Sequence, residues 1–467
     1  MGGFFGVVTG EDCVSDLFFG TDYHSHLGTR RGGLITLDTD GFTRFIHNIE
    51  NAQFRSKFED DIRKMHGPAG IGVISDHEDQ PLIIGSHLGT YGIVTVGRVR
   101  NVEPLAREAF GAKRHFSEMS RGEINPTELV ATLINRESSF EDGIRAAQEA
   151  VEGSCSILLL TRHGVYAARD KLGRTPIVIG QKPGAYAATM ETCAFPNLDY
   201  RVTRYLGPGE IALLAPEGIR QVKPPKEKMQ ICAFLWVYYG YPASAYEGTN
   251  VEVVRNRCGE ALARSEGLTI DIVAGIPDSG TGHALGYAYT AKVPYRRPFV
   301  KYTPTWPRSF MPQEQEVRDL VAKMKLIPIQ EIIEGKRLLF CEDSIVRGTQ
   351  LKDTIQRLYD HGAREVHMRP ACPPLVYSCD YLNFSRSKSV LDLAARKAIY
   401  EIEGQAEEGL AEYADRTSEK YSAMVERIRR RLNLTSLRYQ DLDDLVAAIG
   451  LPKETLCTHC WDGSSWG

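Results

Sequence analysis

The chain has 467 residues, of which 42% are hydrophobic and 25% charged, as expected for an ordinary globular protein of two or three domains. A formal charge of −4 argues against nucleic acid as a partner, because nucleic-acid-binding surfaces carry a basic excess. No segment reaches the roughly 18 apolar residues of a membrane span, and the N-terminus lacks the charged start of a signal peptide. We therefore expect a cytoplasmic protein, without a membrane partner, whose 10 cysteines are reduced.

Short apolar runs separated by glycines predict β-strands in the first two hundred residues. The clearest of these runs lie at 4–8, 70–74, 92–96 and 156–160. Helices are predicted at 126–135 and 139–151, because apolar residues recur there at helical spacing. The turn at 205–210 leads into a strand, and the polar, proline-containing stretch 222–228 predicts a linker.

From about residue 230 the pattern changes to strand, loop and helix in repetition. A strand at 270–274 leads into the loop 275–280, and a helix is expected at 283–290. The last seventy residues read as helices that end in a tail with two cysteines.

A second strand, loop and helix follow in the same half of the chain. The apolar run 337–341 is typical of a buried parallel strand. The amphipathic helix after it is expected to have Gly362 at its C-cap, and the next strand covers 365–368. These elements form a βαβ unit, which predicts an open parallel α/β sheet.

The loop between that strand and helix has two halves with different chemistry. Glu342 and Asp343 leave the carboxyl end of a strand, where ligands bind in open α/β sheets. Adjacent carboxylates there can hold a ribose diol and a nearby Mg²⁺. Residues 344–349 turn into a helix N-terminus, whose free N–H groups and dipole favour a phosphate. Gly348 permits the tight turn, and the Thr349 hydroxyl can donate to a phosphate oxygen.

An isolated acid pair after a strand would more often cap the next helix. Here a strand, an acid pair, an Arg-Gly-Thr sequence and an amphipathic helix follow one another without a gap. That combination favours a sugar-phosphate site over a capping role.

The chain resembles type I phosphoribosyltransferases at their phosphoribosyl pyrophosphate motif, through Asp343-Ser344-Ile345-Val346-Arg347-Gly348-Thr349. The version is that of glutamine phosphoribosylpyrophosphate amidotransferases, which start purine synthesis. Two more segments match in the same order: 277–287 resembles that family's pyrophosphate-side loop, and 308–325 resembles its mobile loop. The resemblance covers essentially the whole chain and is strongest from 230 to 380.

The resemblance assigns roles to individual residues. It implies that Glu342 and Asp343 bind the ribose and Mg²⁺, with Ser279 near the metal. It also implies that Asp343, Arg308 and Lys325 are catalytic, the two cations closing on the leaving pyrophosphate. The implied substrate-binding set is Asp278, Ser279, Glu342, Asp343, Ser344, Ile345, Val346, Arg347, Gly348 and Thr349. Since the family usually has Asp at the position of Glu342, one extra methylene should displace this carboxylate slightly.

The first part of the chain resembles the family's N-terminal nucleophile glutaminase. The matching segments are 4–6, 168–170, 173–176 and 206–210. In that family a cysteine directly after the start methionine attacks the glutamine amide, its own α-amino group acting as base. This chain has Gly2 there.

The residues that support this nucleophile in the family also have no counterpart. They are an arginine, an Asn-Gly oxyanion pair and a glutamine-binding Asp, and they align with 73–76, 96–97 and Pro126. Four separate losses indicate natural decay of the site. We therefore expect no Cys-dependent glutamine hydrolysis, with ammonia taken up free or from a separate glutaminase.

Cys457 and Cys460 have the two-residue spacing of a pair that binds one metal, which by itself is half a site. Some members of the family that this chain resembles carry a [4Fe–4S] cluster bound by four cysteines. Their pattern matches Cys232, Cys379, Cys457 and Cys460. The resemblance therefore implies a structural cluster. Zinc, with His459 as a substitute ligand, and four reduced thiols are the alternatives.

Three parts are expected. They are a four-layer α+β domain like N-terminal nucleophile hydrolases (1–225), an α/β type I phosphoribosyltransferase domain (226–400) and a helical C-terminal extension (401–467). The implied reaction converts phosphoribosyl pyrophosphate and ammonia into phosphoribosylamine and pyrophosphate, in a homo-oligomer with Mg²⁺. Two other hypotheses stay open: a regulatory pseudoenzyme that binds phosphoribosyl pyrophosphate or nucleotides, and a transferase for a different amine.

Overall fold

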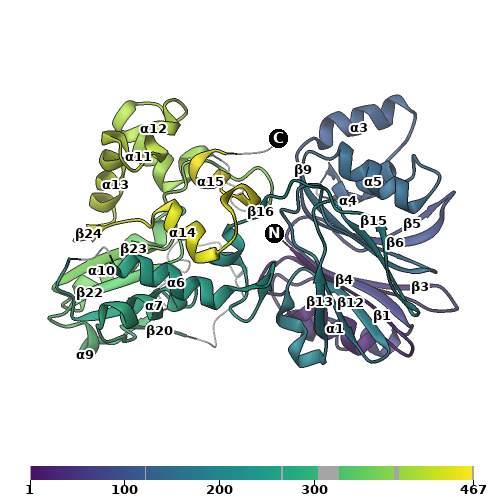
Figure 1. Ribbon diagram of the computed structural model, residues 1–467, viewed down its shortest axis with the longest axis horizontal. Helices are drawn as coiled ribbons and strands as arrows, with labels where there is room; N and C mark the ends of the chain where they lie inside the picture. The colour runs from purple at the N-terminus through teal and green to yellow at the C-terminus, as the bar shows by residue number, and fades with distance from the viewer. Residues whose placement is uncertain (1, 121, 265–266, 303–325, 383–388, 465–467) are drawn as a thin grey trace.

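The computed structural model describes residues 2–120, 122–264, 267–302, 326–382 and 389–464. Figure 1 shows two halves side by side, with the N-terminal strands on the right and the C-terminal helices on the left. None of the helices in these ranges is long and apolar enough to cross a bilayer.

Two antiparallel sheets form the centre of the N-terminal half. The first has the order β13-β11-β12-β1-β4-β2-β3 and the second the order β15-β14-β10-β9-β6-β5. The strands of the first sheet are β1 (Gly3–Thr9), β2 (Arg31–Leu37), β3 (Phe42–Asn48), β4 (Ala69–Ser75), β11 (Val178–Lys182), β12 (Ala185–Thr189) and β13 (Arg201–Tyr205). Those of the second are β5 (Leu82–Ser86), β6 (Gly89–Val99), β9 (Gly153–Thr161), β10 (Gly164–Ala168), β14 (Ile211–Ala215) and β15 (Gly218–Lys223).

Helices cover the outer faces of both sheets. α1 (Val14–Asp22) packs on β1 and β4 of the first sheet, and α4 (Pro126–Ile134) packs on β5 and β6 of the second. The smaller elements of this half are α2 (Phe54–Phe58), α3 (Val102–Gly111), α5 (Phe140–Ala150) and the hairpin β7 (Met119–Ser120) and β8 (Glu123–Ile124). The order helix, sheet, sheet, helix is the four-layer arrangement predicted from the resemblance (Figure 1).

A parallel sheet forms the centre of the C-terminal half, in the order β19-β22-β23-β24. Its strands are β19 (Ile272–Gly275), β22 (Arg337–Glu342), β23 (Glu365–Pro370) and β24 (Ser436–Leu437). The helices of this half are α6 (Val251–Arg264), α7 (Thr281–Ala291), α9 (Gln330–Ile333), α10 (Thr349–Asp360), α11 (Ala394–Glu403), α12 (Leu410–Ala414), α13 (Glu419–Arg431), α14 (Leu442–Ile449) and α15 (His459–Asp462). The open parallel α/β sheet expected from the βαβ pattern is confirmed.

Several short pairings were not expected from the sequence. β24 lies in a region predicted as purely helical, yet it adds a strand to the parallel sheet. β16 (Ile231–Cys232) and β25 (Leu456–Cys457) pair in parallel, and each strand contributes only two residues to the pairing. The remaining pairs are β17 (Ala245–Tyr246) with β18 (Thr249–Asn250) and β20 (Phe299–Lys301) with β21 (Leu326–Pro328). Strands of two or three residues are too short to show the alternating pattern that identifies a strand.

Several predicted boundaries differ slightly from the structure, and two of them concern a linker and a helix cap. β15 continues through Lys223, so the stretch predicted as a linker begins as a strand. α10 is capped by His361, and Gly362 follows the cap with a φ of +83°. A glycine in the left-handed region just after a helix is the usual arrangement at a C-terminus.

One continuous apolar core connects the two halves. It contains Phe4 and Leu158 from between the two sheets and Trp236, Cys372 and Leu445 from the C-terminal half, all fully or almost fully buried. Because the core is shared, removing either half would expose apolar surface on the other. The halves are therefore packed as one body.

Candidate functional site

The acid pair lies at the carboxyl end of β22. Glu342 and Asp343 are both buried, with 8% and 5% of their surfaces exposed. The Asp343 amide donates to Glu342 Oε1 at 3.1 Å, and the Ser344 hydroxyl donates to Asp343 Oδ1 at 2.5 Å. Two carboxylates are thereby held next to each other at the edge where open α/β sheets bind ligands.

The electrostatics of this pair are unfavourable without a cation. Burial raises the pKa of Glu342 well above 4.5, and the neighbouring charge of Asp343 raises it further. A buried guanidinium, that of Arg255 on α6, lies nearby. Burial lowers the pKa of Arg255, and the charge of Asp343 is the largest influence opposing that shift. The Arg255 guanidinium donates to backbone carbonyls, including that of Trp236 at 3.1 Å. A divalent cation would relieve the repulsion between the two acids.

The phosphate half of the loop has the predicted local structure. Gly348 has a φ of +74°, a region that residues with a Cβ rarely adopt, and α10 begins directly after it at Thr349. Ile345 is buried and the Val346 carbonyl accepts from the Ala394 amide at 2.7 Å, which anchors the turn to α11. Arg347 is exposed. The start of α10 therefore faces outward beside the acid pair, as an anion-binding helix end requires.

A second loop approaches the acid pair from β19. Ser279 donates from its hydroxyl to Glu342 Oε1 at 3.4 Å. The approach depends on Gly280, because a Cβ there would lie 2.4 Å from the Cys341 carbonyl oxygen. Asp278 faces outward and pairs with Lys301 at 2.6 Å, and the Pro277–Asp278 peptide bond is cis.

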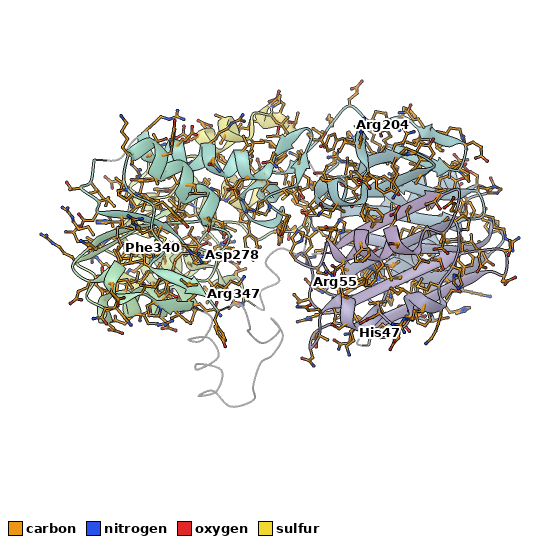
Figure 2. The ribbon with its side chains drawn as sticks, turned by 90° about the horizontal axis from the view of Figure 1, so that it is seen from below. His47, Arg55, Arg204, Asp278, Phe340 and Arg347 are labelled. Atoms are coloured by element: carbon orange, nitrogen blue, oxygen red, sulfur yellow. The ribbon has the colours of Figure 1, made fainter. Side chains whose placement is uncertain are left out.

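The structure brings together most of the predicted sugar-phosphate residues. Figure 2 shows Asp278 and Arg347 in the same half of the molecule, remote from His47 and Arg204 in the other half. The two predicted cations of the mobile loop, Arg308 and Lys325, lie outside the described residues. Sequence reasoning missed Arg255, because it is one of several charged residues on α6 and has no motif around it.

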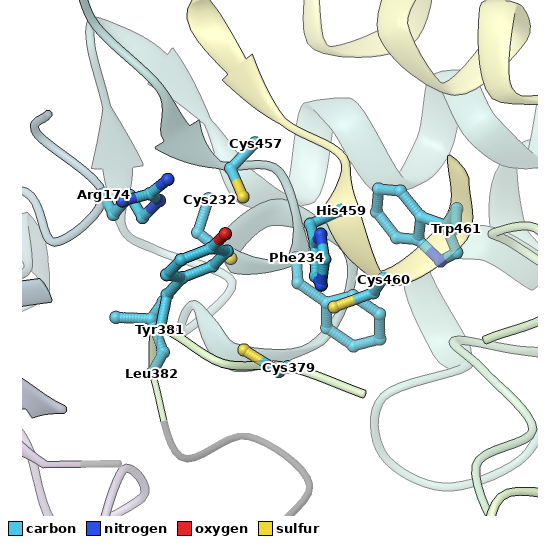
Figure 3. A pocket seen from close by; sticks show the side chains of 10 residues that line it. All are labelled: Arg174, Cys232, Phe234, Cys379, Tyr381, Leu382, Cys457, His459, Cys460 and Trp461. Carbon is cyan, nitrogen blue, oxygen red and sulfur yellow. The ribbon is translucent and has the colours of Figure 1, made fainter. Parts of the chain in front are cut away.

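A second site lies where the two halves meet. Cys232, Cys379, Cys457 and Cys460 line one buried pocket, with Tyr381, His459 and other side chains (Figure 3). The space left between these side chains is about 10 Å³. Burial, followed by the charges of Cys457 and Cys379, raises the pKa of Cys232. A hydrogen bond with Cys379, followed by burial, raises the pKa of Cys460. The four thiols line one pocket and are donors that one multi-atom group could take.

A site for a single metal ion has stricter requirements than a site for a multi-atom group. Among the residues that the structure describes, no three or more His, Cys, Asp or Glu side chains form a group that could hold a metal ion. A zinc ion needs all of its sulfur ligands within about 2.3 Å of one point. The cysteine pocket is thus not arranged as a zinc site in this structure.

The start of the chain lies in the middle of the first sheet, where β1 pairs with β4 and β12. A Cβ on Gly2 would lie 2.3 Å from the Ile74 carbonyl oxygen, and one on Gly3 would lie 2.6 Å from the His24 ring. These distances are too short for any real Cβ contact. The backbone around position 2 therefore has no room for a side chain.

Two packed antiparallel sheets covered by helices are followed here by an open parallel sheet with an acid pair at the end of one strand. This is the architecture of a glutamine amidotransferase-type domain fused to a phosphoribosyltransferase domain. Comparisons with known proteins agree with this class. The family profile described as a glutamine amidotransferase domain matches residues 69–195.

Curated relatives extend the match beyond that domain. The chloroplastic amidophosphoribosyltransferase of Vigna aconitifolia is 31% identical over 390 residues, which are 82% of this chain and 73% of that protein. The amidophosphoribosyltransferase of Methanothermobacter thermautotrophicus is 32% identical over 72% of this chain and 66% of that protein. The Methanocaldococcus jannaschii protein of the same name is 26% identical over 99% of this chain and 97% of that protein. The chain belongs to the amidophosphoribosyltransferase family.

Solved structures show that the whole fold is shared. The glutamine phosphoribosylpyrophosphate amidotransferase from B. subtilis, complexed with ADP and GMP, superposes with a TM-score of 0.86 at 25% identity, over 99% of this chain and 96% of that one. A structure described as the allosteric regulatory enzyme of purine biosynthesis gives a TM-score of 0.83 at 25% identity, over 99% and 95%. The expected family and fold class are confirmed.

Proposed function

We propose that the protein forms 5-phosphoribosylamine and pyrophosphate from phosphoribosyl pyrophosphate and ammonia, as in purine biosynthesis. The observation that carries the proposal is the acid pair at the end of β22, followed at once by the Gly348 turn and α10. A sugar diol and a phosphate monoester fit these two adjacent features. Family membership supports the same reaction.

In this proposal Glu342 and Asp343 hold the ribose and Mg²⁺, with Ser279 beside the metal. The buried, mutually repelling carboxylates fit a divalent cation, because the cation replaces like-charge repulsion by attraction. Mg²⁺, when bound, stabilises the charge that develops on the leaving pyrophosphate. The turn 344–349 holds the 5′-phosphate at the start of α10.

The second half of the proposed site would stabilise the leaving pyrophosphate and keep water away from the reacting carbon. Arg308 and Lys325, which lie outside the described residues, would neutralise the charge of the departing pyrophosphate, and water must be kept away from the cationic sugar carbon. Asp278 and Ser279 would line the pyrophosphate side. Water exclusion matters because hydrolysis would otherwise compete with attack by ammonia.

We further propose that the N-terminal domain, over 1–225, does not supply ammonia by a cysteine mechanism. The support is Gly2, whose surroundings leave no room for a nucleophilic side chain. Ammonia would come from solution or from a separate glutaminase. Cytoplasmic location remains a prediction from the sequence, and homo-oligomeric assembly remains one implied by the resemblance. The transferase bounds 226–400 and the extension 401–467 also remain predictions.

A [4Fe–4S] cluster on Cys232, Cys379, Cys457 and Cys460 is also proposed. Four thiols lining one buried pocket are the donor set that such a cluster takes, and three separate chain segments supply them. A structural role is expected, since the proposed reaction contains no redox step. Iron and acid-labile sulfide near four of each per chain, with brown colour, would support the cluster; their absence after anaerobic purification would refute it.

The proposed reaction is tested by an acceptor screen. Purified protein with phosphoribosyl pyrophosphate and Mg²⁺ is given ammonium, glutamine or small amines, and pyrophosphate is measured. We expect ammonium to support release and glutamine to support little. Release only with another amine would identify a different transferase. Binding of phosphoribosyl pyrophosphate with no release for any amine would identify a regulatory protein.

A further inference from the structure

The backbone of Arg174, in the N-terminal domain, lies beside that of Cys232, which in turn lies beside Cys457. The Arg174 carbonyl accepts from the Cys232 amide at 3.3 Å, and Cys232 is paired in register with Cys457 across β16 and β25. On the other side of Arg174, the Leu172 carbonyl accepts from the Gln230 amide at 2.7 Å. The 172–174 loop, β16 and β25 therefore run edge to edge, so that Arg174, Cys232 and Cys457 are neighbours.

The Arg174 side chain is directed into the same pocket and is 2% exposed. Its guanidinium carbon lies 3.7 Å from the centre of the Tyr381 ring, an arrangement visible in Figure 3. It donates to the Gln230 side chain at 3.2 Å and to the Gly153 carbonyl at 3.3 Å. The Arg174 guanidinium and the Cys457 thiol thus line the same pocket.

A second arginine of the same domain contacts the third cysteine segment. Arg98, on β6, donates to the Cys379 carbonyl at 3.2 Å and lies 4.0 Å from the carboxylate of Asp380. Within the described residues, the N-terminal domain thus touches the segments of Cys232, Cys379 and Cys457. None of these contacts involves the decayed glutaminase position.

We infer that Arg174 is a positioning residue for the iron–sulfur cluster: it orients Cys457 and provides the buried positive charge that balances the cysteine-bound group. The inference rests on the cluster proposed above. Hydrogen bonds to the ligating sulfurs and local net charge are two of the factors that set cluster potentials, and residues that orient a ligand matter nearly as much as the ligand itself. The N-terminal domain, which has glycine at position 2, thus contributes a side chain to the cysteine pocket.

The test measures the reduction potential of the cluster in full-length, anaerobically purified protein, by optical or EPR titration. We compare wild type with Arg174→Met and Arg174→Lys. Losing the cation disfavours the reduced, more negative cluster, so Arg174→Met should lower its reduction equilibrium constant about tenfold, equivalent to about 59 mV for one electron. Arg174→Lys keeps the charge and should stay near wild type.

The matched control is Arg169→Met, because Arg169 is equally buried in the same loop but pairs with Glu247 and does not line the pocket. It should lower stability without changing the potential. A cluster with wild-type potential in Arg174→Met, or the same shift in Arg169→Met, would overturn the role of Arg174 alone. Should Arg174→Met assemble no cluster while Arg174→Lys and Arg169→Met do, the role is supported. Wild type devoid of iron and sulfide would instead remove the cluster proposal itself.

Discussion

Glu191, two residues after β12 in the N-terminal domain, accepts a hydrogen bond from the hydroxyl of Tyr246, which lies in the segment leading to α6 of the other half. Glu191 is fully buried, accepts from the Ser244 hydroxyl at 3.2 Å, and has its Oε2 atom 2.9 Å from His26 Nε2. One carboxylate therefore joins donors from both halves. Its position links the first sheet to the helix that carries Arg255.

Replacing Glu191 by Gln should weaken the joint between the halves. Burial alone would raise the pKa of Glu191, but the charge and hydrogen bond of His26 bring it down to about 2. The stabilisation is therefore present above pH 4.5 and is lost as the pH falls toward 2. We expect Glu191→Gln to lower the free energy of unfolding by about 3 kcal/mol at pH 7. Urea unfolding measures this loss, and Tyr246→Phe should cost only about 1 kcal/mol. Equal stability of Glu191→Gln and wild type would contradict the prediction.

The acid pair predicts the outcome of a charge-removing substitution in the transferase site. Asp343→Asn keeps the shape of the side chain but removes the negative charge that the proposed Mg²⁺ and ribose need. Ammonium-dependent pyrophosphate release should fall at least about 100-fold. The control is Asp353→Asn, which should leave the rate unchanged because Asp353 is exposed one turn into α10. Equal rates in the two variants would show that Asp343 is not part of the transferase site.

Ionisation of Glu342 should lower the stability of the ligand-free protein at high pH, although the proposed reaction needs the ionised carboxylate. Because burial and Asp343 raise its pKa in the folded protein, its contribution to stability is fully present below about pH 4.5 and is lost as the pH rises through the raised value. Glu342→Gln cannot ionise, so without Mg²⁺ and substrate it should melt above wild type at pH 8 and together with wild type near pH 4.

The same substitution should abolish turnover and the stabilisation by ligand. Mg²⁺ with phosphoribosyl pyrophosphate is expected to raise the melting temperature of wild type but not of Glu342→Gln. Differential scanning fluorimetry at both pH values, with and without ligand, makes all four comparisons. A Glu342→Gln variant that melts below wild type at pH 8 would show that the carboxylate is stabilising as it stands.

Restoring the family's nucleophile should not restore glutamine hydrolysis. A cysteine at position 2 would place its Cβ 2.3 Å from the Ile74 carbonyl oxygen, and backbone cannot yield as a flexible side chain can. We expect Gly2→Cys to release no more glutamate from glutamine than wild type. Its ammonium-dependent activity should be retained, which would show that the variant is folded. Glutamate formation at a rate comparable to pyrophosphate release would mean that the site is intact except for its thiol.

The regular elements and the sugar-phosphate loop could be predicted because their signals are local. The strand 337–341, the acids after it and the helix after Gly348 follow one another in sequence, and the structure keeps that order at one strand end. The four-layer first domain was expected from segment resemblance and is present in the structure.

Features assembled from distant segments could not be predicted in the same way. Arg255 carries no motif, and Arg174 stands out in the sequence only within the segment 173–176 that resembles the glutaminase domain. The importance of both comes from what folds against them, namely a cysteine pocket for Arg174 and an acid pair for Arg255. The two-residue strand β24 depends on a neighbour, β23, that lies more than sixty positions earlier in the chain. Such a pairing is fixed by tertiary packing rather than by propensity.

The in-register pair of Cys232 and Cys457 has a consequence for how the protein is made. Cys457 is translated 225 positions after Cys232. N-terminal domains generally fold first during synthesis, so the sandwich and the edge at Cys232 would be ready before the segment of Cys457 has emerged. An inorganic group bound by both thiols can accordingly be inserted only after that segment has been translated.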